Sequence, residues 1–516
     1  MKLFIEKYRE KVIGVLSGFD RLVLKGTLRA ISYVGGMRCL LYDMHVLLKD
    51  FSSYVESTTK LLREASTEEA LRLKRPIIYL SSSRDRKEQI AKKIMVRDGI
   101  TDGLICVLSC VEPCISYYVR RDRQSKKLVL ERAQRKCLHL YHYWVDPVFG
   151  FMSGRLQTWF PFSIQLCLNG REWLARQMDR VGMSYKRDEN CFLQVEDFSK
   201  AQSLMDKQIR FGWKEALKHI GLKINPVHKQ IFHRYPVEYY WSVHQSEWAT
   251  DVLFSSPRAL SAIYPQLVRA GIATFSSPDV MRFLGKRLYG NYAGELVSEY
   301  KSRPEGIRVK HRAGANSVKM YDKRGKILRV ETTLNDPKPF KVFRPLEGDP
   351  QGPCAWRPMR KGIADLPRRA RISEASNERY LNGLAVLDTD SPILKMIDPV
   401  CQPILWKGRR VRALRPWSKE DQLMLQTISR GEFSVNGFRN RDLLAHLFPE
   451  VLSKADERRR ASSRITRKLR LLRAHGIIRK VPKTHRYMFT KRGREIALAI
   501  LKYQNVTLKQ LEKAVA

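Results

Sequence analysis

The chain has 516 residues, of which 96 are Lys or Arg and 52 are Asp or Glu, so its formal net charge is +44 at pH 7. An excess of this size argues against an ordinary metabolic enzyme, because like-charge repulsion opposes compaction unless a polyanion is nearby. The 43% hydrophobic and 10% aromatic residues exclude a disordered basic tail. At roughly 150 residues per domain, we expect a folded protein of about three domains with a polyanionic partner, nucleic acid ahead of a membrane surface.

The N-terminal half carries no export or membrane signal. Residues 1–16 are charged throughout and lack the apolar core of a signal peptide. The most apolar stretch, residues 104–119, contains Glu112 and Pro113 and is shorter than the about 20 apolar residues that cross a membrane. We therefore expect a cytoplasmic protein.

Nine cysteines are scattered along the chain, which favours reduced thiols over a disulfide framework. Cys106, Cys110 and Cys114 recur every fourth residue, a spacing that invites a metal interpretation. No Cys-x-x-Cys pair and no nearby Cys or His partner completes a tetrahedral set. We interpret them as buried thiols.

Residues 1–195 predict an α+β domain on an antiparallel sheet, because strands precede a helix, a run of strands follows, and a second helix closes the order. Helices are expected at 84–100 and 171–183. The expected strands are 21–28, 76–82, 104–110, 114–121, 127–133, 136–145 and 154–168.

Residues 196–343 predict a second α+β domain, with helices at 198–221 and 277–288, a strand at 237–254 and a closing hairpin at 316–335. Prolines and basic residues then cluster in 344–415, which we interpret as a basic linker or arm around one helix-like piece, 372–387.

Residues 416–516 predict a compact helical module. Helices are expected at 418–429, 436–448, 454–476 and 491–501, with a two-stranded wing between the last two. This order is typical of a winged helix-turn-helix, and the module resembles the winged-helix domains of bacterial MarR-type regulators.

The third helix of this module and its wing form the most basic segment, since residues 458–480 contain ten Lys or Arg and no Asp or Glu. Ile465, Leu469 and Leu472 are expected to face the core, which leaves arginines and hydroxyls exposed for a DNA major groove. A solvated basic face and an RNA-binding face are the alternatives. The residues expected to contact DNA are Arg458, Arg459, Arg460, Ser462, Ser463, Arg464, Thr466, Arg467, Lys468, Arg470, Arg479, Lys480, Lys483 and Arg486.

The hairpin at 316–335 predicts a polar surface. Its apolar residues fall on one face when a three-residue loop, Lys323-Arg324-Gly325, joins the arms. The opposite face then collects Ser317, Lys319, Tyr321, Arg329, Glu331 and Thr333. It is either an exposed hairpin with weak cross-strand ion pairs or a nucleic-acid site in which carboxylates hold Mg²⁺ or Mn²⁺. In the second case Tyr321 is a nucleophile or a stacking platform.

A further carboxylate pair lies in the strand at 237–254. Glu247 and Asp251 share a side but lie about 13 Å apart along a strand, too far for one ion, whereas a helix would bring them together. Glu247 with Glu331 is the other pair. The candidate catalytic residues are therefore Tyr321, Glu331, Glu247 and Asp251, with Glu331 and Glu247 as metal ligands; core-edge polar residues are the alternative.

Aromatic residues lie beside cations at 117–121, 141–144, 159–162 and 239–241, a pattern typical of single-strand binding or of a core. The expected contacts of the body with nucleic acid are Lys319, Arg329, Arg120 and Arg121. The strips 356–373 and 406–417 combine Arg, Trp and Pro and could follow a phosphate backbone.

Two resemblances bear on function. The string VKMYDK with LRVE is similar to a strand pair of rolling-circle replication initiators, although His139 and His142 have one residue too many between them for the initiators' metal motif. The strings GFDRLVLKGTL, KCLHLYHYW, GRLQTWFPFSIQLCLNGREWLARQMD, NSVKMYDKRGKILRVETTLND and GEFSVNGFRNRDL resemble a widespread bacterial family whose genes look like those of mobile elements. That likeness implies a mobile genetic element and no particular reaction.

The sequence therefore predicts a nucleic-acid-binding protein of a bacterial mobile element, with duplex DNA on the C-terminal module and single-stranded DNA or RNA on the body. A metal-dependent nuclease or strand transferase that uses Mg²⁺ or Mn²⁺ is the enzymatic version of this hypothesis. The alternatives are an RNA-binding component of a ribonucleoprotein and a winged-helix transcription regulator.

Overall fold

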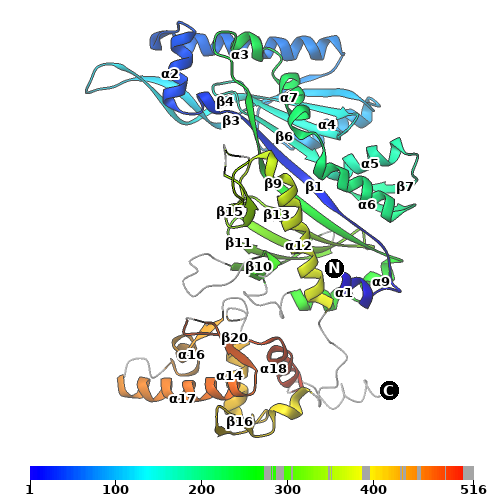
Figure 1. Ribbon diagram of the computed structural model, residues 1–516, viewed down its shortest axis with the longest axis vertical. Coiled ribbons are helices and arrows are strands. Elements are labelled where there is room, and N and C mark those ends of the chain that lie inside the picture. Colours follow the sequence, from blue (N-terminus) through cyan, green and yellow to red (C-terminus); the bar gives the residue numbers. More distant parts are fainter. Residues whose placement is uncertain are drawn as a thin grey trace. The chain divides into compact units, whose positions relative to one another are not determined.

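The computed structural model shows an α+β protein, as predicted (Figure 1). It describes residues 1–271, 280–281, 283–285, 296–303, 306–346, 349, 351–385, 396–429, 433, 437–449, 455–482 and 484–503. Most of the predicted helix at 277–288 lies outside these residues. One 11-stranded sheet has the order β10-β11-β12-β13-β9-β1-β6-β5-β4-β3-β2. It is mixed, because β2 pairs with β3 in parallel whereas β3 and β4 are antiparallel.

The strands of this sheet are, in chain order, β1 Val12–Leu28, β2 Ile77–Leu80, β3 Gly103–Arg121, β4 Leu128–Asp146, β5 Gly150–Gln157, β6 Ile164–Asn169, β9 Tyr239–Phe254, β10 Leu296–Arg303, β11 Gly306–Ala313, β12 Asn316–Lys323 and β13 Ile327–Leu334. Four predicted strands between 104 and 145 are in fact one long hairpin, since β3 and β4 pair without a break from Cys106 to Arg121. Pro113 lies within β3 opposite Lys136 and does not end the strand.

The chain divides into two compact units. The body unit comprises residues 15–251 and 333–374, and the terminal unit comprises residues 1–14, 252–332 and 375–516. Each unit combines segments that are separate in the sequence, whereas the four predicted domains are continuous.

The body unit buries its largest hydrophobic core between sheet and helices. Helix α3 packs on one side of β3 through Ala70, while α4 packs on β2 and β3 through Ala91 and Ile94. The helices are α2 Val34–Asp43, α3 Phe51–Arg72, α4 Lys87–Arg97, α5 Gly170–Arg180, α6 Phe198–Asp206, α7 Trp213–Ile224 and α8 His228–Ile231. Two small sheets accompany them, β7 Tyr185–Asp188 with β8 Cys191–Val195 and β14 Lys341–Arg344 with β15 Ala355–Pro358.

The expected basic arm, 344–415, is more ordered than predicted. It contains α12 Leu366–Ala385, which begins before the expected helical piece at 372–387. Arg369 and Tyr380 of α12 are buried, and the Arg369 guanidinium donates hydrogen bonds to the carbonyls of Val243 and Leu334. Apolar residues every three or four positions bury this helix, so this stretch is no exposed arm.

The C-terminal part of the terminal unit has its own hydrophobic core. Its elements are the hairpin β16 Ile404–Trp406 and β17 Arg409–Val411, then α14 Lys419–Ile428, β18 Phe438–Arg439, α16 Asn440–Leu447, α17 Ala455–Ala474, β19 Ile478–Lys480, β20 Arg486–Phe489 and α18 Lys491–Tyr503. The three short strands form one sheet in the order β18-β20-β19. The Ser418 hydroxyl caps α14 as predicted, because it accepts a hydrogen bond from the Asp421 N–H. The remaining helices of this unit are α1 Lys2–Lys7, α9 Pro257–Ser261 and α10 Tyr264–Arg269.

The structure bears on two further predictions, the reduced cysteines and the lack of a membrane-spanning segment. All nine cysteines lie outside any disulfide; Cys106 and Cys110 are buried as predicted, whereas Cys114 is half-buried. Among the residues that the structure describes, no helix is long and apolar enough to cross a membrane.

Gly170 is expected to be essential for the packing of α5 against β1. The Asn169 side chain caps α5, and a Cβ at Gly170 would lie 1.7 Å from the carbonyl oxygen of Phe19. We expect Gly170→Ala to lower the free energy of unfolding by about 2 kcal/mol or more, because rigid backbone must shift. Gly212→Ala, where a Cβ meets nothing within 4 Å, is the matched control. Equal melting temperatures of the two variants would contradict this packing.

Candidate functional site

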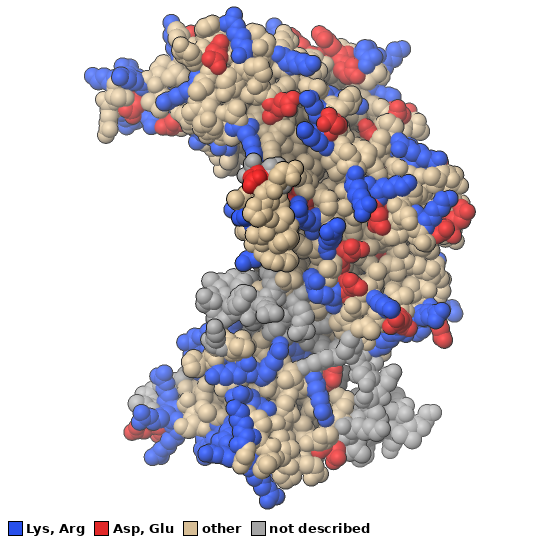
Figure 2. Space-filling view, in the orientation of Figure 1, with Lys and Arg blue, Asp and Glu red and all other residues tan. Residues whose placement is uncertain are grey.

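The described C-terminal part holds a basic cleft of about 590 Å³. The β16–β17 hairpin, α14 and α17 form its walls. Its lining residues are Arg409, Arg410, Val411, Arg412, Glu420, Arg464, Arg467, Lys468, Arg470 and Leu471. Seven cations thus face one carboxylate, and Figure 2 shows Lys and Arg side chains gathered on this part of the chain. A concave surface with one sign of charge concentrates anions.

Asp421 ties the three elements of the cleft together. Its buried carboxylate accepts two hydrogen bonds from the Arg412 guanidinium, at 2.8 and 2.9 Å, and one from the Arg415 N–H at 3.0 Å. The Lys468 ammonium of α17 forms an ion pair with the same carboxylate. Burial alone would raise the pKa of Asp421, but these donors outweigh it and lower the pKa to about 2.

The cations of the cleft fall into two groups. Arg464 and Lys468 pair with Glu420 at 3.2 and 3.0 Å, and Arg412 pairs with Asp421, so part of their charge is neutralised within the protein. The second group has no acidic partner among the described residues and consists of Arg409, Arg410, Arg467 and Arg470. These four guanidiniums are available for an external anion.

An indole lies beside the cleft. Trp406, the last residue of β16, has the Arg470 and Arg473 guanidiniums 5.9 and 5.4 Å from its ring centroid and the Lys407 ammonium at 5.4 Å. Cations within about 6 Å of an indole face are attracted to it. Trp406 therefore orients part of the basic surface of α17.

The core side of α17 is as predicted, since Ile465, Leu469 and Leu472 are buried. On the outer side, Ser462 is half-buried and donates to Asn440 Oδ1, and the Asn440 amide donates to the Thr466 hydroxyl. These two hydroxyls are therefore engaged with α16. The exposed members of the predicted set are Arg458, Arg459, Arg460, Ser463, Arg464, Thr466, Arg467, Arg470, Arg479 and Lys480. Arg486 is half-buried on β20, and Lys483 lies outside the described residues.

Sequence reasoning treated 458–480 as a segment without acids and missed the acids that fold against it. Glu420 and Asp421 belong to α14, more than forty positions earlier. The Arg-rich strip 406–417 was recognised as a candidate phosphate contact, but its pairing into the β16–β17 hairpin was not. Only the tertiary fold brings that hairpin to α17.

The β12–β13 hairpin differs from the expected one in its loop. β12 ends at Lys323 and β13 begins at Ile327, so the loop is Arg324-Gly325-Lys326, one residue later than predicted. Arg324 and Gly325 both have positive φ, 56° and 70°, which a glycine at the second position accommodates. The loop length, three residues, is unchanged, so the division into an apolar and a polar face holds.

Most of the polar face of this hairpin is buried, with Lys319 and Tyr321 half-buried, which corrects the expectation of an exposed surface. Glu331 is 1% exposed, and its carboxylate pairs with the Lys319 ammonium at 2.5 Å and accepts a hydrogen bond from the Tyr321 hydroxyl at 3.0 Å. Arg329 is fully buried, so its guanidinium is not on the surface where a nucleic acid would contact it. Polar residues of alternating strand positions can be buried when, as here, they pair with one another.

The body contacts predicted on β3 are exposed. Arg120 forms ion pairs with Glu131 at 2.6 Å and Asp122 at 3.6 Å, whereas Arg121 is exposed at the end of the strand. Of the neighbouring aromatic residues, Tyr117 is buried and donates to the Ile31 carbonyl. Many of the expected stacking platforms are core, since Tyr143, Trp144, Phe160 and Phe162 are also buried. Trp241 is buried too, but it lines a pocket beside α7.

An acidic pocket of about 460 Å³ lies in the body unit. Asp20 of β1 and Glu247 of β9 line it, and their carboxylate oxygens lie within 4.8 Å of each other. The Asn190 amide donates to both oxygens of Asp20, and the Gln245 amide donates to Glu247. The other charged residues of the lining are Glu88, Glu172, Glu189, Arg21, Lys92 and Arg187.

Sequence reasoning identified Glu247 and missed Asp20. Asp20 is the single acid in the apolar run of β1, and 227 positions separate it from Glu247. A buried acid in a strand core was the available signal, because such a group needs partners to be tolerated. Glu331 belongs to the terminal unit, so its pairing with Glu247 stays a prediction.

Asp251 has a structural partner. Its buried carboxylate pairs with the fully buried Arg171 guanidinium at 2.9 Å, and Arg171 Nε lies 3.9 Å from Asp20 Oδ1. A buried charge needs such compensation. This geometry makes Asp251 a support of Arg171, and the catalytic role predicted for Asp251 stays a prediction.

His139 and His142 do not share a ligand position. His139 Nδ1 contacts the Cys137 carbonyl and its Nε2 contacts Arg155, whereas His142 contacts Ser66. Burial lowers the pKa of both imidazoles to about 4, so they are neutral. Their opposite directions agree with the expectation for strand positions three apart.

Comparisons with protein families, curated proteins and solved structures give no significant match. The chemistry of this chain is therefore argued from its own residues.

The Asp421 contacts make the C-terminal part sensitive to acid. Because its folded pKa is about 2 and an unpaired Asp titrates near 4, the stability it contributes is present above pH ~4 and lost as the pH falls to ~2. We expect α14 and α17 to lose about 1 to 2 kcal/mol of protection against amide hydrogen exchange in that window. Asp421→Asn should be less stable at neutral pH and lack this step. The same acid profile in both proteins would refute the role of the carboxylate.

Proposed function

We propose that this chain is a nucleic-acid-binding protein that docks on duplex DNA through α17 and the basic cleft beside it. The observation that carries the proposal is the set of four cleft arginines without an acidic partner, Arg409, Arg410, Arg467 and Arg470. Arg is suited to this role because its planar guanidinium can donate two parallel hydrogen bonds to the oxygens of one phosphate. The net charge of +44 supports the same partner over the whole chain.

The element order supports a winged helix-turn-helix as the docking module. Helices α14, α16 and α17, the sheet β18-β20-β19 and helix α18 follow the order of that fold, with α17 in the position of the recognition helix. At 20 residues, α17 is about 30 Å long, enough to cross a major groove. Arg479 and Lys480 at the start of the wing would then meet the adjacent phosphates.

The resemblance to mobile-element proteins gives this proposal its context: a bacterial mobile element whose protein grips its own nucleic acid. An RNA partner for the body and a role as a transcription regulator are the alternatives. Sequencing the nucleic acid that copurifies with the full chain separates them. One RNA indicates the RNA-binding alternative, a defined duplex indicates the transcription regulator, and a single strand indicates a strand contact of the body.

Removing two cleft arginines should weaken DNA binding. We expect Arg467→Ala combined with Arg470→Ala to lower the affinity for duplex DNA about tenfold at moderate salt, since two phosphate contacts are lost. Fluorescence anisotropy with a labelled duplex measures this loss. Arg38→Ala with Arg63→Ala, two exposed arginines of the body unit, is the matched control. An affinity no lower than that of the control would sink the proposed cleft.

A second function is favoured by the acidic pocket of the body unit. Asp20 and Glu247 present two carboxylates within 4.8 Å, the hard oxygen ligands that Mg²⁺ and Mn²⁺ prefer. A cation held there would polarise a phosphodiester and favour attack by water. Arg21 of the same pocket would hold the charged strand, whereas Lys92 and Arg187 pair with Glu88 and Glu172. We therefore propose metal-dependent phosphodiester cleavage as the activity of this unit.

Cleavage should depend on both carboxylates. We expect the full chain to cut single-stranded or duplex DNA with Mn²⁺ or Mg²⁺, and Asp20→Asn or Glu247→Gln to reduce the rate at least about a hundredfold by weakening the cation site. Glu56→Gln, an exposed acid of α3 in the same unit and outside the pockets described, is the control. The same assay with Glu331→Gln tests the predicted role of Glu331. Equal products from wild type and Glu247→Gln would exclude the pocket as a catalytic site.

A further inference from the structure

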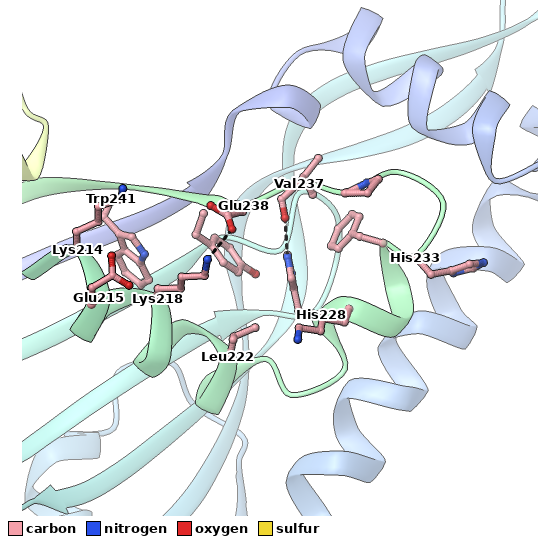
Figure 3. A pocket seen from close by; sticks show the side chains of 13 residues that line it. Lys214, Glu215, Lys218, Leu222, His228, His233, Val237, Glu238 and Trp241 are labelled. Atoms are coloured by element: carbon pink, nitrogen blue, oxygen red, sulfur yellow. Dashed lines mark hydrogen bonds and ion pairs between the residues drawn. The ribbon is translucent and has the colours of Figure 1, made fainter. Parts of the chain in front are cut away.

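A pocket of about 600 Å³ opens in the body unit between α7, α8 and the first residues of β9 (Figure 3). Its volume is within the range of small-ligand sites, about 300–1,000 Å³. The residues that line it are Lys214, Glu215, Lys218, Leu222, His228, Lys229, Phe232, His233, Pro236, Val237, Glu238, Tyr239 and Trp241. It shares no lining residue with the acidic pocket.

One wall of this pocket is a connected series of rings. The ring centroids of Phe232 and His228 are 4.9 Å apart, those of His228 and Tyr239 are 5.2 Å apart, and those of Tyr239 and Trp241 are 6.1 Å apart. Leu222 of α7 adds an aliphatic surface. The wall is thus suited to a flat, aromatic ligand, which gains stacking contact with such rings.

His228 keeps this wall uncharged. Its Nε2–H donates to the Val237 carbonyl at 2.8 Å, as the dashed line in Figure 3 marks, and burial lowers the pKa of the imidazole. The neutral ring then carries a lone pair on Nδ1, which is buried without a hydrogen-bond partner. An aromatic ligand would therefore contact an uncharged imidazole, whose Nδ1 is a buried hydrogen-bond acceptor.

Three lysines and two glutamates, Glu215 and Glu238, belong to the lining. Lys214 and Lys218 are one turn apart on α7, and Lys229 follows from α8. Lys218 pairs with Glu238 at 2.9 Å, but both side chains are more than half exposed, so the pair is weak and an anion can compete with it. No ion pair holds Lys214 or Lys229 within the described part of the chain. An aromatic wall with three ammonium groups in the same lining fits a ligand that is flat at one end and anionic at the other.

We infer that this pocket binds one nucleotide, with its base against the ring series of Phe232, His228, Tyr239 and Trp241 and its phosphate at the lysines of the lining, Lys214, Lys218 and Lys229. The inference rests on the proposed function and extends it to a second, base-stacking contact on the body unit. The nucleotide is either part of a single strand or free, because both present the same base and phosphate.

Two variants of different character test the pocket. Lys214→Glu with Lys229→Glu reverses the charge at the opening, and Leu222→Trp fills the space beside the rings. Lys200→Glu, an exposed lysine of α6 outside the pocket, is the matched control. Binding of a short labelled single-stranded oligodeoxynucleotide, of adenosine monophosphate and of a labelled duplex is measured for each full-length protein by anisotropy or calorimetry.

We expect both pocket variants to bind the single strand about tenfold more weakly than the control, the effect of losing one stacked base, while duplex affinity is unchanged. If wild type binds adenosine monophosphate saturably and the variants do not, the ligand is a free nucleotide. If the variants lose binding of the oligonucleotide alone, the ligand is a nucleotide within a single strand. Binding of the single strand and of adenosine monophosphate that equals the control in both variants, or no binding of either probe by wild type, overturns the inference. A wild-type protein that binds the strand but no duplex contradicts the proposed function and leaves the pocket supported.

Discussion

The buried carboxylate of Asp421 is the constraint on which the DNA-binding account depends. It accepts donors from Arg412 beyond the β16–β17 hairpin, from the backbone at Arg415 and from Lys468 of α17. Without it, an arginine and a lysine would be close together with no compensating charge, at a cost of several kcal/mol in a partly buried setting. The one internal acid thus permits cations on both walls of a cleft and leaves the outer arginines for an external anion.

Acidic and basic side chains are arranged differently in the C-terminal part and in the body unit. In the C-terminal part, acids are few and serve to assemble a basic surface. In the body unit, Asp20 and Glu247 converge in a pocket, and the buried pair of Arg171 and Asp251 supports Asp20 from behind. Basic surfaces bind a phosphate backbone, whereas converging carboxylates bind the divalent cations that polarise a phosphodiester. This arrangement is what the proposed function, binding and cleavage of nucleic acid, requires.

Local features were predictable from the sequence, and contacts between distant segments were not. The hydrophobic periodicity of α17 placed Ile465 and Leu469 in the core, and Ser418 marked the start of α14. The polar face of the β12–β13 hairpin looked exposed because alternation alone does not tell which layer covers a face. Asp20 was missed for a related reason: its meaning depends on Glu247, and one sequence gives no measure of their proximity. The role of Asp421 likewise follows from tertiary packing.

The salt dependence of duplex binding tests the central claim most directly. If the four free cleft arginines neutralise phosphates, at least four counterions are released, and log Kobs for the full chain should fall against log salt concentration with a slope of about −4 or steeper. Filter binding or anisotropy over a series of salt concentrations gives this slope. An affinity that does not change with salt would contradict the account, because no set of arginine–phosphate contacts can be insensitive to screening.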